Sequence, residues 1–294
     1  MNLIEFQQRF SSEEDCIEYL IQQRWPEGYR CTRCGHGESG YHPARRHFQC
    51  KACKYQQTIT AGTMFHRTRT PLLEWFWSIY WMSNSKKGIS VLELQRLLGA
   101  KDYERVHRIK RRIQEAMDNR ESLYQLDGFV EVDEAFFGGA RSGKPGRGAE
   151  NKAIVLVSVS VLDTDKPGYA KMKVIENASA KSIQETIQEQ VKPGTTIASD
   201  QWPSYYKLTE KGYEHIACPI QKPQDNQTFL PWVNILISNA KRFILGTHHS
   251  VKLENLQNYL SEFCFRFNRR LFNNGLFQRT LFAGLCYQPP YLRA

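Results

Sequence analysis

The sequence predicts an α+β protein of several domains, and three features of the chain lead to this prediction. Two cysteine pairs with C-x-x-C spacing lie within residues 31–53. Helical periodicity with many basic residues follows over residues 61–122, and the apolar pattern changes to a period of two near residue 126. We therefore expect N-terminal helices with a small cysteine-bearing module over residues 1–60, a helical region over residues 61–122, and an α/β domain with a mixed five-stranded sheet over residues 123–294.

The excess positive charge of the chain lies mostly in its front part. The 40 Lys/Arg and 30 Asp/Glu give a net charge of +10, and residues 1–120 contain 20 and 13 of them, a net +7. This distribution favours a phosphate-bearing partner, although a charge that only keeps the protein in solution would give the same count. No 18-residue apolar run and no secretory signal pattern is present, so a cytoplasmic, nucleoid-associated protein is expected.

The clustered cysteines predict a metal site. Fifteen residues separate the pair Cys31 and Cys34 from the pair Cys50 and Cys53. A two-residue gap lets both thiolates turn toward one ion, and two such pairs complete a tetrahedral thiolate site. A redox-active C-x-x-C would not need the second pair. We therefore expect structural Zn²⁺ on these four cysteines, with residues 41–49 forming the hairpin arm of a zinc ribbon.

The region after the ribbon predicts two consecutive helices, over residues 91–98 and 103–117. Ser90 is a suitable N-cap with Glu93 at the third helical position, a capping box, and Gly99 is a suitable stop. A short capped helix, a tight turn and a basic helix are typical of a helix-turn-helix, whose second helix enters the major groove of DNA. A helical hairpin with a solvated charged face is the alternative. The expected DNA contacts are five cations within eight residues: Arg105, Arg108, Lys110, Arg111 and Arg112.

Alternating apolar residues predict the elements of the back part. Strands are expected over residues 128–139, 154–162 and 169–175, then a helix over residues 178–191 and a fourth strand over residues 195–200. Residues 141–152 predict a basic loop. The chain beyond Leu253 is expected to be helical, with most of its aromatic residues packed on the sheet.

Two aspartates mark the first and fourth of these strands. Asp133 lies in the first strand and Asp200 ends the fourth. In an RNase H-like sheet, which has this element order, the two strands are neighbours, so the two carboxylates would converge. Facing carboxylates are costly unless cations neutralise them, and two divalent metal ions about 4 Å apart support phosphodiester chemistry. Either aspartate alone would be an ordinary strand-end residue, but together they predict a catalytic site.

The helix expected to supply a third metal ligand contains no acid. This helix covers residues 231–245, and Asn234 follows Asp200 by 34 residues, with Lys241 seven residues further on. Seven residues are nearly two turns, so Asn234 and Lys241 share one face. Asn234 is expected to offer its carbonyl oxygen to a metal ion and Lys241 to hold a phosphate. Asn239 is the rival ligand, and an Asn234 side chain that only bonds within its helix is the other alternative.

Several stretches of the chain resemble a known family. They are Cys31-Thr-Arg-Cys-Gly, Phe48-Gln-Cys-Lys-Ala-Cys, Ala61-Gly-Thr-Met-Phe-His, Lys87-Gly-Ile-Ser, Val130-Glu-Val-Asp-Glu-Ala-Phe-Phe-Gly-Gly, Ala198-Ser-Asp-Gln-Trp, Gly246-Thr-His-His-Ser-Val and Tyr259-Leu-Ser-Glu-Phe-Cys-Phe-Arg-Phe-Asn-Arg-Arg. In these blocks and in their order the chain is similar to the zinc-ribbon insertion-sequence transposases of the IS-fifteen-ninety-five group, which are ISXO-like.

The resemblance implies an RNase H fold that cuts double-stranded DNA at terminal inverted repeats and joins the 3′ ends to target DNA, using Mg²⁺, with Mn²⁺ expected to substitute. By motif position, Asp133 and Asp200 look like the first two catalytic acids. Asn234 with Lys241 fits the branch of the family in which asparagine replaces the third acid. Because two DNA ends must be joined in concert, a homodimer or higher oligomer is expected on DNA.

Two other functions share part of this pattern. A transposase-derived protein that binds DNA without cutting it would keep the ribbon, the helix-turn-helix and the charge. Metal-dependent cleavage separates the two, and in the sequence only Asp133 and Asp200 favour the enzyme. A nuclease for RNA–DNA hybrids would keep both acids but has no need for two sequence-reading modules.

Overall fold

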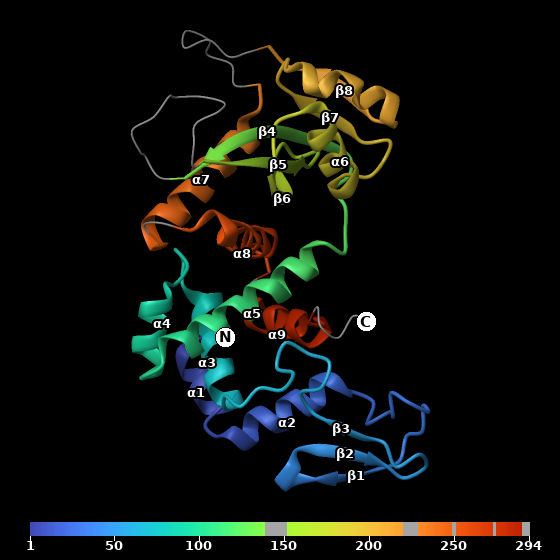
Figure 1. The fold of residues 1–294 in the computed structure, drawn as a ribbon, viewed down its shortest axis with the longest axis vertical. Helices are drawn as coiled ribbons and strands as arrows, with labels where there is room; N and C mark the ends of the chain where they lie inside the picture. The colour runs from blue at the N-terminus through green and yellow to red at the C-terminus, as the bar shows by residue number, and fades with distance from the viewer. Residues whose placement is uncertain (139–151, 220–228, 249–250, 273–274, 290–294) are drawn as a thin grey trace. The chain divides into compact units, whose positions relative to one another are not determined.

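The computed structural model describes residues 1–138, 152–219, 229–248, 251–272 and 275–289 (Figure 1). The chain divides into two compact units, one formed by Met1–Ala116 with Phe272–Ala294 and the other by Met117–Leu271. Within the described residues, no helix combines the length and the apolar character that crossing a membrane requires.

The first unit begins with the two helices that the sequence predicts, α1 (Leu3–Arg9) and α2 (Glu13–Arg24). The side chain of Ser12 accepts a hydrogen bond from the backbone of Asp15, and the Asp15 carboxylate bonds back to the backbone of Ser12. This reciprocal pair satisfies amide groups that the first turn of a helix leaves without partners. The polar residues between the two apolar stretches therefore fix where α2 begins.

The ribbon follows as a three-stranded antiparallel sheet in the order β1-β2-β3. Strands β1 (Ser39–His42) and β2 (His47–Cys50) pair around the short helix η1 (Pro43–Arg45), and β3 (Gln56–Thr58) pairs with β2. The predicted hairpin arm over residues 41–49 is thus confirmed. Trp25, Tyr29 and Phe48 pack beside the cysteines and form a small core of their own.

Three helices come next, and one of them, α4, begins and ends at the expected capping residues. They are α3 (Leu72–Asn84), α4 (Val91–Leu98) and α5 (Tyr103–Glu121). Ser90 accepts a hydrogen bond from the backbone of Glu93, and Gly99 ends α4 with a left-handed φ of 60°. The structure shows no hydrogen bond from the Ser90 backbone to the Glu93 side chain. Ser90 is therefore an N-cap, but the expected capping box is incomplete.

The last described helix, α9 (Leu276–Cys286), belongs to the first unit. The sequence predicted instead that all of residues 123–294 form the sheet domain. The ring of Phe277 lies 5.6 Å from those of Phe6 and Phe10. The backbone of Met64 donates a hydrogen bond to Gly284 at 2.9 Å. The apolar face of α9 correctly predicts that the helix is buried, but it does not predict in which of the two units.

The second unit is built on a mixed five-stranded sheet in the order β6-β5-β4-β7-β8. The strands are β4 (Phe129–Phe137), β5 (Ala153–Val161), β6 (Pro167–Ile175), β7 (Thr196–Ser199) and β8 (Glu214–Ala217). The first three pair antiparallel, whereas β4 with β7 and β7 with β8 are parallel. This is the order expected of an RNase H-like sheet. The 3-10 helix η2 (Pro203–Lys211) precedes β8, and residues 141–151 of the predicted basic loop lie outside the described residues.

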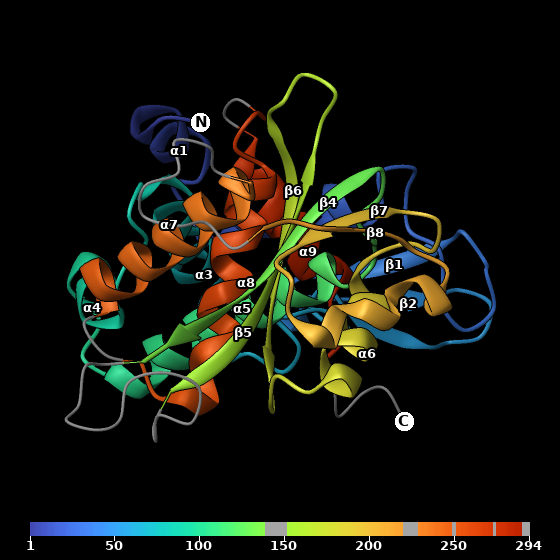
Figure 2. The same cartoon turned by 90° about the horizontal axis from the view of Figure 1, so that it is seen from above.

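Helices cover both faces of this sheet (Figure 2). On one face, α7 (Pro231–His248) and α8 (Leu256–Asn268) bury Val155, Val157 and Val159 of β5. On the other face, α6 (Ala180–Gln190) and η2 bury alternate residues such as Val130, Val132 and Leu156. Because successive residues of a strand point to opposite faces, each strand contributes to both cores.

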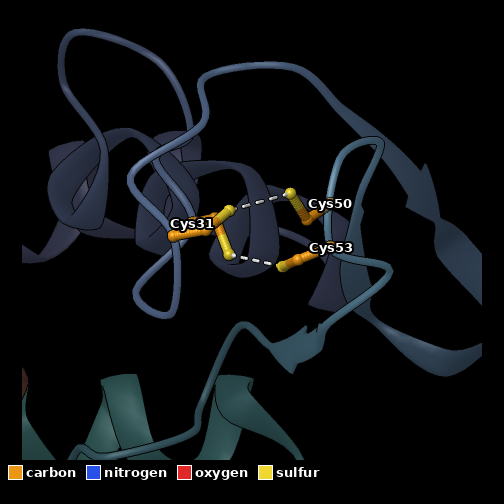
Figure 3. A group of neighbouring side chains, drawn as sticks. Cys31, Cys50 and Cys53 are labelled. Carbon is orange, nitrogen blue, oxygen red and sulfur yellow. Dashed lines mark hydrogen bonds between the residues drawn. The ribbon is translucent and has the colours of Figure 1, made fainter.

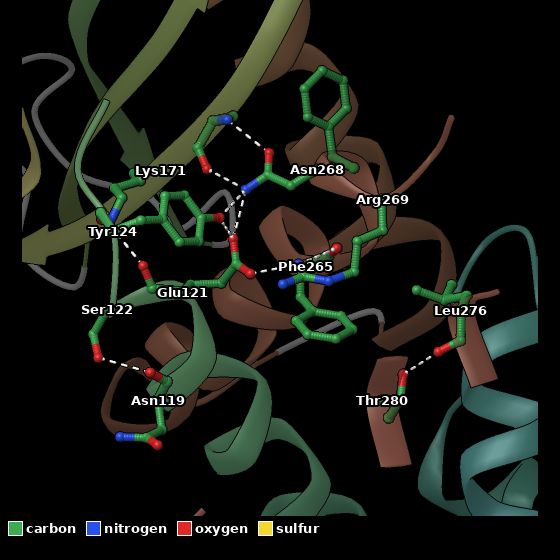
Figure 4. A network of polar contacts seen from close by, with 12 residues as sticks. Asn119, Glu121, Ser122, Tyr124, Lys171, Phe265, Asn268, Arg269, Leu276 and Thr280 are labelled. Carbon is green, nitrogen blue, oxygen red and sulfur yellow. Dashed lines mark hydrogen bonds and ion pairs between the residues drawn. The ribbon is translucent and has the colours of Figure 1, made fainter. Parts of the chain in front are cut away.

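A buried polar network joins the end of α5 to the sheet within the second unit (Figure 4). Glu121 is 6% exposed and pairs with Arg269, which is 9% exposed. The side-chain amide of Asn268 donates to Glu121 and, at 2.8 Å, to the hydroxyl of Tyr124. The ammonium group of Lys171 donates to the backbone carbonyl of Glu121 at 2.7 Å. The buried charges are therefore paired and hydrogen-bonded, which is the condition under which burial is tolerated.

Candidate functional site

The four predicted zinc ligands lie together in the ribbon (Figure 3). Their sulfur atoms all lie within 4.8 Å of one another. The Sγ atoms of Cys31 and Cys53 are 3.6 Å apart, and so are those of Cys34 and Cys50. Four thiolates at a Zn–S distance of about 2.3 Å in a tetrahedron lie about 3.8 Å from each other. The cluster therefore has the size and the donor set of a structural zinc site.

Each cysteine pair is shaped by the same backbone turn. The backbone of Gly35 donates to Cys31 at 2.8 Å, and that of Lys54 donates to Cys50 at 3.1 Å. Both donors have left-handed conformations, with φ of 74° at Gly35 and 60° at Lys54. Glycine adopts this conformation at little cost, whereas lysine pays for it. The second turn is therefore held against a local preference, as expected where two ligands must face one ion.

The thiol pKa values also fit a cation in this position. Burial raises the pKa of Cys31, but backbone amides of Arg33 and Cys34 and the neighbouring thiols lower it to about 6. A backbone bond from His36 lowers the pKa of Cys34, but the other three thiols raise it to about 12. Without a cation the four sulfurs cannot all be thiolates, and a divalent ion removes this conflict.

The two predicted catalytic aspartates meet beside adjacent parallel strands, Asp133 within β4 and Asp200 directly after the end of β7. In the pairing of β4 with β7, Glu131 lies opposite Ala198. Two residues further along both strands, the same register sets Asp133 opposite Asp200, which directly follows β7. Carboxylate oxygens of Asp133 and Asp200 belong to a cluster whose ligand atoms lie within 4.8 Å of one another. The expectation that these two side chains converge is thus met.

A third acid, Glu134, belongs to the same cluster and was missed in the sequence. Strand alternation assigns Glu134 to the face opposite Asp133, yet a carboxylate oxygen of Glu134 lies within 4.8 Å of those of Asp133 and Asp200. On that face Tyr205 of η2 is fully buried. Burial raises the pKa of Tyr205 well above its usual range, and the carboxylates of Glu134, Asp133 and Asp200 raise it further. Glu134 is therefore close both to the aspartate pair and to the Tyr205 side chain.

Helix α7 is tied to β4 close to the aspartates. The carboxylate of Glu131, a residue only 3% exposed, accepts a hydrogen bond from the backbone of Val233 at 2.8 Å. Burial raises the pKa of Glu131, and backbone bonds from Val233 and Trp232 oppose that rise. Eight residues after Val233, the Lys241 ammonium lies 5.7 Å from the centre of the Phe137 ring. Helix α7 thus passes over β4 on the face that carries Asp133.

The two asparagines of α7 lie on opposite flanks of the helix. Five residues turn a helix by about 140°, so Asn239 cannot share the flank of Asn234 and Lys241. The ring of Phe243 contacts Phe263 of α8 at 5.8 Å, and α8 packs on β6, on the side of α7 away from β7. Asn234 and Lys241 lie on the flank away from α8, the side of β7 and Asp200. The Asn234 amide donates to the Leu230 carbonyl at 2.8 Å, within its own helix.

The five cations of α5 do not form one exposed row. Arg108 and Arg111 are exposed, and Arg111 pairs with Glu115 at 3.1 Å. Arg105 is half-buried and lies 3.3 Å from Glu74. Arg112 donates to the backbone carbonyls of Met64 and His66 at 3.2 and 3.1 Å.

Lys110 is the clearest departure from the expected DNA contacts. It is only 1% exposed, because it lies on the face of α5 that also buries Val106, Ile109 and Ile113. A count of cations along a helix does not tell which of them point into the core. The prediction of a DNA contact is therefore corrected for Lys110, and the expectation weakens for Arg112, whose guanidinium holds backbone carbonyls of its own unit.

Comparisons with known proteins match both parts of the chain. Residues 125–268 match the ISXO2-like transposase domain, and residues 11–56 match the transposase zinc-ribbon domain. An uncharacterized protein in transposable element ISH50 of Halobacterium salinarum is 24% identical over 279 residues, 87% of this chain and 91% of the relative.

Solved structures that the chain is similar to include a pre-cleavage Mos1 transpososome, at 13% identity and a TM-score of 0.29 over 71% of this chain and 79% of that one. They also include a Mos1 transposase paired-end complex with the left transposon end, at 10% identity and a TM-score of 0.21 over 73% and 80%. With scores this low, the fold assignment rests on the strand order and pairing described above.

Proposed function

Because the chain belongs to the family of IS1595 transposases, with their zinc ribbon and ISXO2-like domain, we propose that it binds the terminal inverted repeats of an insertion sequence, cleaves the DNA at those ends and joins the 3′ ends to target DNA. The observation that carries this proposal is the juxtaposition of Asp133, within β4, and Asp200, which directly follows the parallel strand β7.

Asp133, Asp200 and Glu134 are the residues that would hold divalent metal, with Mg²⁺ as the first candidate. Hard cations prefer carboxylate oxygen ligands, and oxygens within 4.8 Å of one another can share an ion or bridge two. When bound, such ions polarise the phosphodiester and lower the pKa of attacking water. Of the chain's own groups, Asp133 and Asp200 fix the position of the scissile phosphate, and Glu134 adds the carboxylate that α7 lacks.

Helix α7 contributes the remaining polar groups of the proposed site. Asn234 would offer its carbonyl oxygen, which its bond to Leu230 leaves available because only the amide nitrogen takes part. Lys241 would hold a phosphate of the bound strand, since it is an exposed cation on the flank of Asn234 and its ammonium lies 5.7 Å from the centre of the Phe137 ring. The flank that these two residues share supports Asn234 over Asn239 as the neutral ligand.

The first unit would bind the DNA. It contains the zinc ribbon, the α4–α5 pair and the larger share of the excess positive charge. Arg108 and Arg111 are the α5 cations that remain exposed for base or phosphate contacts. Since two ends of an element must be joined in one event, the active species would be a dimer or a larger assembly on DNA.

A DNA-binding protein without cleavage activity is the second candidate, because α7 carries no acid at the place of a third carboxylate. The test uses a labelled duplex bearing the element's own end, a target plasmid and Mg²⁺ or Mn²⁺. The transposase proposal expects metal-dependent cleavage at the element end and a labelled strand joined to the plasmid. Binding that prefers the element end, without cleavage in either metal, would favour the second candidate and overturn the first.

A further inference from the structure

A basic groove lies in the first unit, outside the predicted helix-turn-helix. Its volume is 610 Å³. Three segments line it: the turn of the ribbon hairpin at Arg45 and Arg46, the stretch after β3 at residues 58–60, and the run over residues 66–73 that leads into α3. All three belong to the first unit, so the groove depends on no arrangement between units.

The charges that line the groove are strongly one-sided. Four arginines line it, against Glu13 as the one acid among its lining residues. Arg45, Arg67 and Arg69 are exposed, and no hydrogen bond or ion pair occupies their guanidinium groups within the described part of the chain. These three arginines thus line one groove, and their guanidinium groups have no protein partner among the described residues. An anionic ligand is the chemistry that satisfies them.

Glu13 does not cancel this charge toward a ligand, because its carboxylate is already used. One oxygen accepts from Arg46 at 2.6 Å and from the backbone of Leu72 at 3.0 Å. The other accepts from the backbone of Leu73 at 2.9 Å. Glu13 therefore caps the first turn of α3 and holds Arg46, and it leaves Arg45, Arg67 and Arg69 as the free cations of the groove.

The walls of the groove are held in place by two half-buried arginines. Arg24 donates to the carbonyls of Ile59 and Ala61, and Arg112 donates to those of Met64 and His66. The hydroxyl of Thr68 accepts a hydrogen bond from the indole of Trp75 at 3.0 Å. These bonds fix both segments that follow the ribbon. The free guanidinium groups thus project from a fixed backbone, which lowers the entropy lost on binding.

Arg67 occupies a backbone position that favours glycine. Its φ is 54°, in the left-handed region. A side chain with a Cβ atom costs free energy there, and such strain is found where the residue is needed for function. The presence of arginine, and not glycine, at this turn therefore agrees with a role for the Arg67 side chain.

We propose that this groove binds the phosphodiester backbone of double-stranded DNA through Arg45, Arg67 and Arg69. This inference rests on the proposed function. It states that the first unit contacts DNA phosphates through the groove beside α3 as well as through α5. Four arginines and four threonines line the groove and supply the donors that a phosphate backbone accepts, which favours DNA over a compact cofactor. Contacts of this kind position DNA and do not read its sequence.

The test compares the wild type with Arg67→Ala/Arg69→Ala in binding to two duplexes, one with the element end and one with a scrambled sequence, over a series of salt concentrations. Each lost phosphate contact lowers the slope of log K against log salt by about 0.9. The double variant is expected to lose about 1.8 from that slope and to weaken on both duplexes by the same factor. Arg67→Lys/Arg69→Lys keeps the charge and is expected to keep most of the slope.

The matched control is Lys181→Ala/Lys252→Ala, which removes two cations whose side chains are 84% and 83% exposed in the other unit. It is expected to bind like the wild type. A groove variant that retains the wild-type slope and affinity would overturn the groove while leaving the proposed function intact. A wild type that binds neither duplex would overturn both.

A second measurement does not depend on the variants. Phenylglyoxal modifies exposed arginines, and bound duplex is expected to protect Arg67 and Arg69 of the wild-type protein from modification. Equal modification of these two residues with and without saturating duplex would contradict the groove.

Discussion

Asp200 directly follows the last residue of β7, and the parallel register of β4 with β7 sets it opposite Asp133. The two carboxylates therefore meet at the end of β7, and both side chains are only half-buried. Mutual repulsion of two carboxylates is unfavourable unless a cation neutralises it. Convergence of these residues thus costs stability, and the proposed binding of divalent metal would offset that cost.

The zinc ribbon leads to a prediction about thiol reactivity. Of the four cysteines outside the ribbon, only Cys286 is exposed, while Cys16, Cys218 and Cys264 are buried. Burial also raises the pKa of Cys16 to about 12. The native zinc protein is expected to show one thiol that reacts rapidly with a chromogenic disulfide at pH 8, and five after chelation. Reaction of the ribbon thiols at the same rate before and after chelation would contradict the zinc site.

The contact between Glu131 and α7 predicts a stability effect. Glu131→Ala removes the acceptor for the first backbone amides of α7 and leaves them without a partner in a buried place. Loss of a buried bond to a charged group costs about 1.5–3 kcal/mol. Urea unfolding is expected to report a loss in that range, whereas Glu131→Gln keeps an acceptor oxygen and is expected to lose about 1 kcal/mol or less. Equal losses in the two variants would mean that the bond does not hold the helix.

The pair Glu121 and Arg269 predicts strong non-additivity. Arg269→Met leaves a buried carboxylate without its cation, which costs about 3–5 kcal/mol. Removing both charges in Glu121→Gln/Arg269→Met is expected to recover much of this loss. A double-mutant cycle on the free energy of unfolding measures the coupling. Single losses that simply add would show that the two groups stabilise the fold independently.

The opposite flanks of α7 predict different outcomes for its two asparagines. Asn234→Ala is expected to lower metal-dependent cleavage by about tenfold or more, because it removes a ligand on the side of Asp200. Asn239→Ala is the matched control on the other flank and is expected to stay within about threefold of the wild type. The apparent Mg²⁺ affinity in the cleavage assay should fall only for Asn234→Ala. The reverse ranking would assign the ligand to Asn239.

Much of the fold could be predicted from the sequence, because its local signals agree with the tertiary structure. Ser90 and Gly99 are capping residues whose chemistry acts within one turn, so they mark the two ends of α4 without knowledge of the rest. The strand over residues 214–217 was missed because only Ile216 and Ala217 in it are apolar and no alternation is visible. It forms because β7 offers an open edge.

The candidate site was predictable only in part, for reasons of side-chain reach and burial. Asp133 and Asp200 follow from strand order, but Glu134 belongs by alternation to the other face, and its place in the cluster depends on where its side chain reaches. Lys110 was expected on the surface because its neighbours are cations, yet burial depends on which face of α5 meets the core. The groove at Arg67 joins three segments that are separated along the chain, and no local pattern brings them together.

The central claim is that Asp133 and Asp200 form a metal-dependent catalytic site. The most direct measurement is Mg²⁺- or Mn²⁺-dependent cleavage of a duplex bearing the element end by the wild type, Asp133→Asn and Asp200→Asn, with DNA affinity measured on the same samples. Both variants are expected to bind the duplex normally and to lose cleavage by about 10²–10³-fold or more. Cleavage that persists in either variant at wild-type rates, or a wild type that binds the element end and never cuts it, would contradict the claim.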